Sequence, residues 1–267
     1  MATLKDVVYG AAVGDALGVP YEFRERGTFA CTGMVSGGSH GQPAGTFSDD
    51  TSMMLATCDS IRECGRIDTD DMRERFRTWA YKGKYTPDGI MFDIGNATST
   101  ALAQGRGCAD VRSNGNGSLM RIAPLAFTDA TDDEVRAVSA ITHAHKISTE
   151  ACVAFIGVLR RIIGGASVAE AVDGVRIGKN VFDPAKPVGE VRSGGYVLDT
   201  FDAALWCLCN TGTYADCVLS AVNLGRDTDT TACVAGAVAG AVYGLDAIPE
   251  KWVDALRRKD IIDACLF

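Results

Sequence analysis

Two short acidic segments, far apart in the chain, offer the clearest chemistry in this sequence. Residues 47–51 read FSDDT and residues 226–230 read RDTDT, so each segment places two carboxylates beside hydroxyl groups. Each segment leads into an apolar run that predicts a buried helix. Carboxylate and hydroxyl oxygens are the ligands that Mg²⁺ and Mn²⁺ prefer. Two helices that meet at their N-termini could therefore supply a binuclear metal site.

N-capping is the alternative interpretation of both segments. Ser, Thr and Asp are favoured at helix starts because a side-chain oxygen accepts a backbone N–H and negative charge suits the helix dipole. One capping residue per helix meets that need, whereas each segment has two carboxylates ahead of its helix. Four clustered carboxylates repel one another, and burying them unpaired is costly. We therefore favour the metal site.

Other polar residues near apolar runs are weaker candidates. Asp15 lies in an apolar helical run and is interpreted as a core carboxylate bonded to backbone, while Glu22 is either a loop carboxylate or a further acidic group facing the metals. Residues 112–124 form a Gly- and Asn-rich loop running into an apolar helix, which could cradle a phosphate or be a plain turn. His143 and His145 are two apart and do not share a helix face, so at most one should face a site.

The elements that must position these side chains are predicted to be helices, because strand-like alternation is poor and apolar residues recur at helical spacing. Long loops rich in Gly, Ser, Asn and Asp are expected at 27–47, 82–95, 107–117 and 178–195. No linker or fixed-period repeat divides the chain, so residues 1–267 are expected to form one all-α domain. The predicted helices are 4–17, 52–64, 70–81, 98–105, 131–144, 148–163, 197–210, 214–224, 230–243 and 252–256.

Composition narrows the class of protein. With 47% apolar and 22% charged residues the chain is globular, and a net charge of −8 argues against a nucleic-acid-binding protein. The longest apolar run, residues 231–245, is 15 residues long, shorter than the roughly 20 that a membrane span needs. The 10 cysteines include no CxxC pair, and we interpret them as reduced thiols of a cytoplasmic protein. No secretory signal is expected, and a monomer is the default expectation.

Taken in chain order, these segments resemble the motifs of the ADP-ribosylglycohydrolase family, which includes the dinitrogenase reductase-activating glycohydrolases. Any one motif is modest, but the ordered set is specific and spans nearly the whole chain. The matching motifs are GDALG at 14–18 with Glu22, FSDDT at 47–51, DIGNAT at 93–98, GNGSLMRIAP at 115–124, Thr142-His143, GGYVLDT at 194–200 and GRDTDT at 225–230.

The resemblance implies an all-α fold around a binuclear Mg²⁺ or Mn²⁺ centre. Ser48 stands where many members have Thr, and because the hydroxyl is kept we expect the ligand to be kept. The metal ligands that the resemblance implies are Ser48, Asp49, Asp50, Asp227, Asp229 and Thr230.

The resemblance also assigns roles around the metals. Asp93 matches an acidic residue at the scissile end of the substrate and Glu22 a carboxylate that gates the site, so both are candidate catalytic residues. The candidate substrate-binding residues are Ser113, Gly115, Asn116 and Gly117 in a diphosphate-binding loop, His143 in the ADP-ribose cleft and Tyr196 in the adenosine region.

These assignments predict a metal-dependent hydrolase that removes ADP-ribose from a modified protein, with Asp93 favouring arginine-linked ADP-ribose. The alternatives are serine-linked ADP-ribose, O-acetyl-ADP-ribose, or a catalytically silent ADP-ribose-binding module. A silent module would be free to lose ligands, whereas every ligand position here carries an oxygen. A terpenoid-type enzyme with Asp-rich motifs is disfavoured because its aspartates would be spaced across helical turns. The expected partner is an ADP-ribosylated protein or conjugate.

Overall fold

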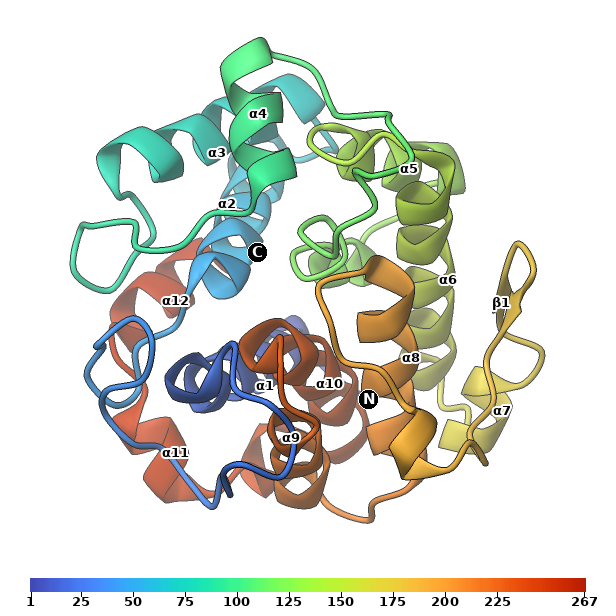
Figure 1. The fold of residues 1–267 in the computed structure, drawn as a ribbon. Helices are drawn as coiled ribbons and strands as arrows, with labels where there is room; N and C mark the ends of the chain where they lie inside the picture. Colours follow the sequence, from blue (N-terminus) through green and yellow to red (C-terminus); the bar gives the residue numbers. More distant parts are fainter.

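The computed structural model describes every residue from Met1 to Phe267 and is built almost entirely from helices (Figure 1). The prediction of an all-α fold is confirmed, since the strands β1 (Arg176–Ile177) and β2 (Asn180–Val181) form only a two-residue antiparallel pair. The helices are α1 (Leu4–Gly18), α2 (Asp49–Cys64), α3 (Thr69–Lys82), α4 (Asn96–Gln104), α5 (Asp132–Ala140), α6 (Lys146–Ile163), α7 (Val168–Val172), α8 (Val197–Cys209), α9 (Tyr214–Asn223), α10 (Thr228–Tyr243), α11 (Glu250–Ala255) and α12 (Lys259–Cys265).

Helices α1 and α10 form the centre of the core. Both are buried on nearly every side, as expected of helices that are apolar all round. Glycines let the two backbones touch: a Cβ added to Gly14 would lie 2.0 Å from the carbonyl oxygen of Ala232, and one added to Gly236 would lie 2.2 Å from that of Gly10. The remaining helices pack around this pair, so the positions of α1 and α10 set the geometry of whatever lies at their ends.

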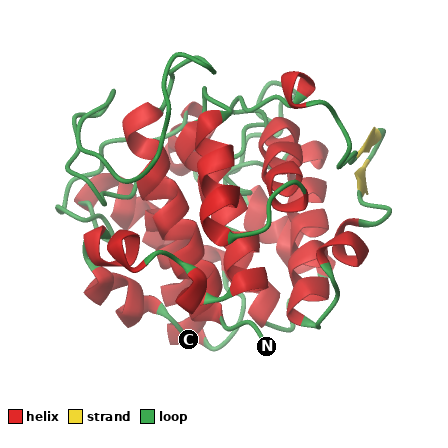
Figure 2. Ribbon diagram, turned by 90° about the horizontal axis from the view of Figure 1, so that it is seen from below, coloured by secondary structure: helices red, strands yellow, loops and turns green.

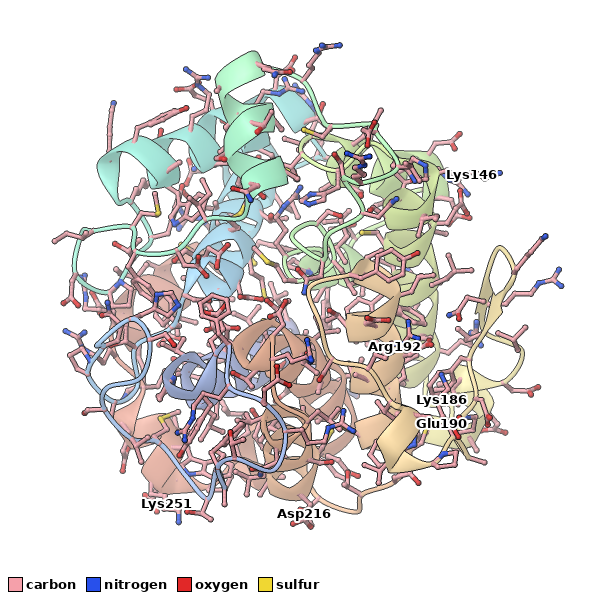
Figure 3. The ribbon with its side chains drawn as sticks, in the orientation of Figure 1. Lys146, Lys186, Glu190, Arg192, Asp216 and Lys251 are labelled. Carbon is pink, nitrogen blue, oxygen red and sulfur yellow. The ribbon has the colours of Figure 1, made fainter.

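The loops and the chain termini lie at opposite ends of the helical assembly. Figure 2 shows the long loops gathered along one side and both termini at the other. Charged side chains such as Lys146, Asp216 and Lys251 are exposed and point outward (Figure 3). Charged groups inside the helical assembly are therefore exceptions, and most of the buried carboxylates belong to the site described below. No helix has both the length and the apolar character needed to cross a bilayer.

Near the site, one predicted helix is absent and another is shorter than predicted. Residues 118–122 form turns rather than a helix, and only the short 3-10 helix η2 (Ala123–Phe127) follows them, because Pro124 cannot donate to a helical ladder. Helix α5 ends at Ala140, so residues 142–145 form a connection and not a helix end. His145 then caps α6, where its ring nitrogen accepts from the backbone N–H of Ile147.

Candidate active site

Asp15 of α1 holds the first turn of α2 in place. Its carboxylate accepts hydrogen bonds from the backbone N–H groups of Ser48 and Thr51 at 3.0 and 3.1 Å, and from the Thr51 hydroxyl at 2.6 Å. Asp15 is completely buried, and the prediction of a core carboxylate bonded to backbone is confirmed. Ser48 is the N-cap of α2, with its hydroxyl accepting from the N–H of Asp50. The acidic FSDDT segment is thus fixed by α1.

The N-termini of α2 and α10 meet, as the spacing predicted. The Thr230 hydroxyl lies 3.3 Å from Oδ2 of Asp50, and the Ser48 hydroxyl donates to the same oxygen at 2.9 Å. Gly18, at the end of α1, brings the chain against the start of α10, since a Cβ there would lie 2.3 Å from Cα of Asp229. Residues 180 positions apart therefore contribute to one cluster of oxygen atoms.

Two residues with a left-handed backbone conformation lie next to the cluster and orient two of its carboxylates. Phe23, directly after Glu22, has φ 67°, and Arg226, directly before Asp227, has φ 66°. The two turns are tied together because the N–H of Phe23 donates to the carbonyl of Arg226 at 2.7 Å. Such a conformation costs a non-glycine residue about 1–3 kcal/mol, so the fold holds these residues in place against strain.

The carboxylates form two overlapping groups that share Asp229. Oxygen atoms of Asp15, Asp50 and Asp229 lie within 4.8 Å of one another, and so do those of Glu22, Asp227 and Asp229. Oδ1 of Asp50 is buried and has no hydrogen-bond partner. A buried carboxylate oxygen without a donor is costly, and a cation would satisfy it. The donor set is oxygen throughout, so the residues present fit hard divalent cations such as Mg²⁺ or Mn²⁺.

Burial raises the pKa values of these carboxylates, and repulsion between them raises most of the values further. Burial, followed by the charge of Asp93, raises the pKa of Glu22 to about 9. Burial raises the pKa of Asp15 to about 6, against the hydrogen bonds that stabilise its charged form. Burial is also the leading cause of the raised pKa values of Asp49, Asp50, Asp227 and Asp229.

These shifts predict how the stability of the cation-free protein depends on pH. An acid whose folded pKa is raised binds more protons in the folded than in the unfolded state, so stability falls as pH rises between the two values. We expect the free energy of unfolding in chelator to fall between pH 6.5 and 8, by about 1.4 kcal/mol per pH unit for each proton retained, and the melting temperature to fall with it.

The lower limit of that range reduces an opposing effect. Burial lowers the pKa of His143 to about 3, so below pH 6.5 the unfolded chain takes up a proton that the folded one does not. Added Mg²⁺ should replace the retained protons. The increase in melting temperature on adding Mg²⁺ should therefore be larger at pH 8 than at pH 6.5. A cation-free melting temperature that rises across this range would contradict the expectation.

A cavity of about 450 Å³ opens beside the cluster. The cluster's Asp49, Asp227 and Thr230 reach it, whereas Ser48, Asp50 and Asp229 lie behind them. The Gly- and Asn-rich loop forms another part of its lining. The predicted site residues that line this cavity are Glu22, Asp49, Asp93, Ser113, Gly115, Asn116, Gly117, His143, Asp227 and Thr230.

Asn116 ties this loop to the acidic cluster. Its side-chain amide donates to Oδ2 of Asp227 and to the Thr200 hydroxyl, each at 2.8 Å. Gly115 pairs with Tyr196 through a single β-bridge. The side chain of Tyr196 is 41% exposed and lies outside the cavity lining, so of the predicted binding residues it alone stands apart.

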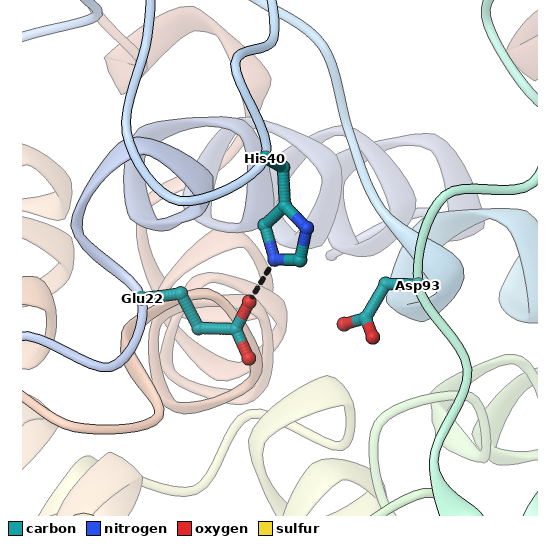
Figure 4. A group of neighbouring side chains, drawn as sticks. All are labelled: Glu22, His40 and Asp93. Carbon is teal, nitrogen blue, oxygen red and sulfur yellow. Dashed lines mark hydrogen bonds and ion pairs between the residues drawn. The ribbon is translucent and has the colours of Figure 1, made fainter.

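His40 also lies at the site, although no sequence motif pointed to it. Its Nε2 atom lies 2.5 Å from Oε2 of Glu22, and the carboxylate of Asp93 faces the pair across the opening (Figure 4). The imidazole is flanked by Phe23 and Phe92, with ring centroids 5.9 and 5.2 Å away. The available signal was a single histidine within the glycine-rich stretch GGSHG, in one of the long loops expected from the sequence.

Fold and site together define an all-α protein in which a carboxylate and hydroxyl cluster meets a glycine- and asparagine-rich loop at one cavity. The family model described as ADP-ribosylglycohydrolase matches residues 3–266. The chain belongs to the ADP-ribosylglycohydrolase family, a family of hydrolytic enzymes, and the resemblance seen in its motifs is confirmed.

Curated relatives align along nearly the whole chain. The ADP-ribosylarginine hydrolase Tri1 of Serratia proteamaculans is 34% identical, covering 97% of this chain and 76% of that protein. The ADP-ribosyl-[dinitrogen reductase] glycohydrolase of Rhodospirillum rubrum is 33% identical, covering 94% of this chain and 88% of that protein. A solved structure described as an ADP-ribosylglycohydrolase-related protein complex is 31% identical, with a TM-score of 0.81 over 97% of this chain and 93% of that one.

Proposed function

We propose that this protein is a metal-dependent hydrolase that releases ADP-ribose from arginine side chains of modified proteins. The observation that carries the proposal is one cavity lined both by the acidic cluster and by the Gly- and Asn-rich loop. Relatives named as ADP-ribosylarginine hydrolases, 34% identical over most of the chain, support the choice of arginine.

The metal site belongs to the same proposal. Asp229 belongs to both overlapping carboxylate groups, and the unpartnered Oδ1 of Asp50 lies in one of them, so the cluster offers oxygen ligands for divalent cations. Bound there, two divalent cations would hold the hydroxyls of the distal ribose and lower the pKa of a bound water. The residues proposed to hold them are Ser48, Asp49, Asp50, Asp227, Asp229 and Thr230.

Asp93 and Glu22 stand where the reacting bond would lie. Hydrolysis breaks the bond between C1″ of the ribose and a guanidine nitrogen; water oxygen goes to C1″, and the nitrogen takes a proton. Asp93 is our candidate for moving that proton, with Glu22 second. The guanidinium of modified arginine is a cation, and the side chains facing it are two carboxylates with His40 bonded to one of them.

The loop and the neighbouring residues would hold the rest of the ligand. Ser113, Gly115 and Gly117 line the cavity beyond the acidic cluster, and backbone N–H groups in such a loop suit diphosphate oxygens. Asn116 is already committed to Asp227 through its amide, so we propose that it fixes the distance between the diphosphate subsite and the metals. Tyr196 is exposed outside the cavity lining, and we propose that it contacts the adenosine end of the ligand.

We also propose a cytoplasmic location and a monomeric enzyme. All ten cysteines are free thiols, as expected in a reducing compartment.

The proposal is tested by release of ADP-ribose from an arginine-ADP-ribosylated protein, with Mg²⁺, with Mn²⁺ and with chelator. We expect release that depends on the cation. Asp93→Asn should lower kcat by about 10²–10⁴-fold, the range typical of a lost acid or base, while ADP-ribose binds with unchanged affinity. Asn has nearly the shape of Asp, so a change in packing is avoided.

A serine-linked substrate and O-acetyl-ADP-ribose run in parallel. Release only from one of these would retain the metal site and overturn the choice of arginine. Binding of ADP-ribose without release from any substrate would instead indicate a binding module. If Asp93→Asn lowers the affinity for ADP-ribose as much as it lowers kcat, Asp93 does not act at the scissile bond.

A further inference from the structure

Arg121 is a buried cation that the proposed reaction does not use. It lies in the turns at 118–122, is fully buried, and stacks over the Phe76 ring with 4.5 Å between guanidinium carbon and ring centroid. No carboxylate pairs with it, and its Nε and Nη1 atoms have no partner. Burial lowers its pKa to about 10, so it stays protonated at neutral pH. A cation kept at this cost needs a compensating role.

The remaining guanidinium nitrogen connects Arg121 to a histidine at the cavity. Nη2 donates to the Thr142 hydroxyl at 2.9 Å and to the carbonyl of Val138 at 3.2 Å. The Thr142 hydroxyl in turn lies 2.9 Å from Nδ1 of His143. All three side chains are at most 2% exposed, so water does not share these contacts.

Only one arrangement of protons satisfies every group in the hydrogen-bonded series from Arg121 through Thr142 to His143. A guanidinium can only donate, so the oxygen of Thr142 is the acceptor for Arg121. The hydroxyl has one proton and a single further neighbour, Nδ1 of His143, which must then accept it. In the opposite arrangement Nδ1–H would donate, and the buried hydroxyl proton of Thr142 would have no acceptor, which is costly.

The other ring nitrogen of His143 faces the cavity. A Cβ added to Gly115 would lie 3.3 Å from Nε2, and one added to Gly117 would lie 3.5 Å from it. Both glycines and His143 line the cavity, and no protein group bonds to Nε2. Nε2 therefore faces a ligand beside the glycine loop, either with a proton to donate or with a lone pair to accept one.

We propose that Arg121, acting through Thr142, is a positioning residue that holds His143 in the neutral tautomer with its proton on Nε2. His143 then donates a hydrogen bond to an oxygen of the ligand, such as a diphosphate or hydroxyl oxygen, and cannot accept one there. Burial, followed by the charge of Arg121, lowers the pKa of His143, so a second proton on the ring is disfavoured. The identity of the ligand rests on the proposed function, whereas the tautomer does not.

The tautomer is measured by two-bond ¹H–¹⁵N correlation spectra of Mg²⁺-loaded protein labelled at histidine, with His143→Gln to assign the signal among three histidines. We expect a bare Nδ1 and a protonated Nε2 in the unchanged protein. Thr142→Val keeps the shape but removes the relay, and should give a mixture of tautomers and about tenfold weaker ADP-ribose affinity. Thr142→Ser restores the hydroxyl and should restore both.

The wild-type spectrum decides the proposal even if a variant fails to fold. A proton on Nδ1 of His143 would overturn it, and so would Thr142→Val with the tautomer unchanged. If the protein releases no ADP-ribose from any substrate but His143 carries its proton on Nε2, the proposed function fails and this inference stands.

Discussion

Replacing Asp229 by asparagine is expected to lower turnover at least 10³-fold, because Asp229 belongs to both carboxylate groups of the cluster. Asparagine keeps the shape but removes a charge that would help to hold cations at the cluster. The melting temperature of the variant in chelator should rise, since one member of a buried, mutually repelling cluster is neutralised. The melting-temperature gain on adding Mg²⁺ should disappear. Thermal scans with and without Mg²⁺, together with Mn²⁺ titration calorimetry, measure these effects.

Asp254→Asn is the matched control because it removes one negative charge from an exposed position on α11. It should leave turnover, cation binding and both melting temperatures unchanged. An active Asp229→Asn protein that still binds Mn²⁺ with wild-type affinity would refute the placement of the metal site. If turnover is lost while cation binding stays intact, Asp229 is not a metal ligand and acts in another way.

Replacing Gly14 by alanine is expected to destabilise the core strongly, because it adds a methyl group where two buried helices touch. The new Cβ would lie 2.0 Å from the carbonyl oxygen of Ala232 and 2.7 Å from its carbon, and neither backbone atom can move aside alone. Helices α1 and α10 would have to separate along their central contact. Overpacking of this kind costs about 3 kcal/mol, or about 10 °C in melting temperature for a chain of this size.

Gly157→Ala provides the comparison. Gly157 lies inside α6, where an added Cβ would meet nothing closer than the tip of Arg161 at 4.0 Å. Alanine stabilises a helix interior by about 1 kcal/mol relative to glycine, so the melting temperature should rise by a few degrees. Because Asp15 and Asp229 lie on the separated helices, Gly14→Ala should also weaken Mn²⁺ binding, whereas Gly157→Ala should not. Equal melting temperatures for the two variants would contradict the tight α1–α10 contact.

The sequence predicted the helices with strong, uninterrupted patterns well. The expected helix 4–17 is found as Leu4–Gly18, and 197–210 as Val197–Cys209. The acidic segments lie at the starts of α2 and α10, as expected from their residue types. Ser48 caps α2 with its side chain, whereas the N-cap of α10, Asp227, makes no side-chain capping bond. A helical pattern and its cap are encoded within a few residues, so one sequence suffices to find them.

Predictions failed where distant contacts outweigh local preference. Residues 118–122 are apolar enough for a helix but form turns instead. The Arg121 side chain there donates a hydrogen bond to the carbonyl of Val138 in α5. Strand β2 forms in a stretch expected to be loop, paired with β1 just before that stretch. Helix α12 was not predicted either, and it follows a left-handed residue, Arg258, with φ 53°. Local preference is weak, and tertiary contacts override it.

The sequence by itself determined the all-α class, the oxygen chemistry of the two acidic segments and the family, because these depend on residue types and their spacing. Only the tertiary structure decided which groups meet. It places His40 against Glu22, ties Asn116 to Asp227 and connects Arg121 through Thr142 to His143. Most of these pairs are separated by many residues, and a bond between distant residues forms only when packed helices bring their ends together. The close contact of α1 with α10, which glycines allow, is the physical reason that the acidic segments become one site.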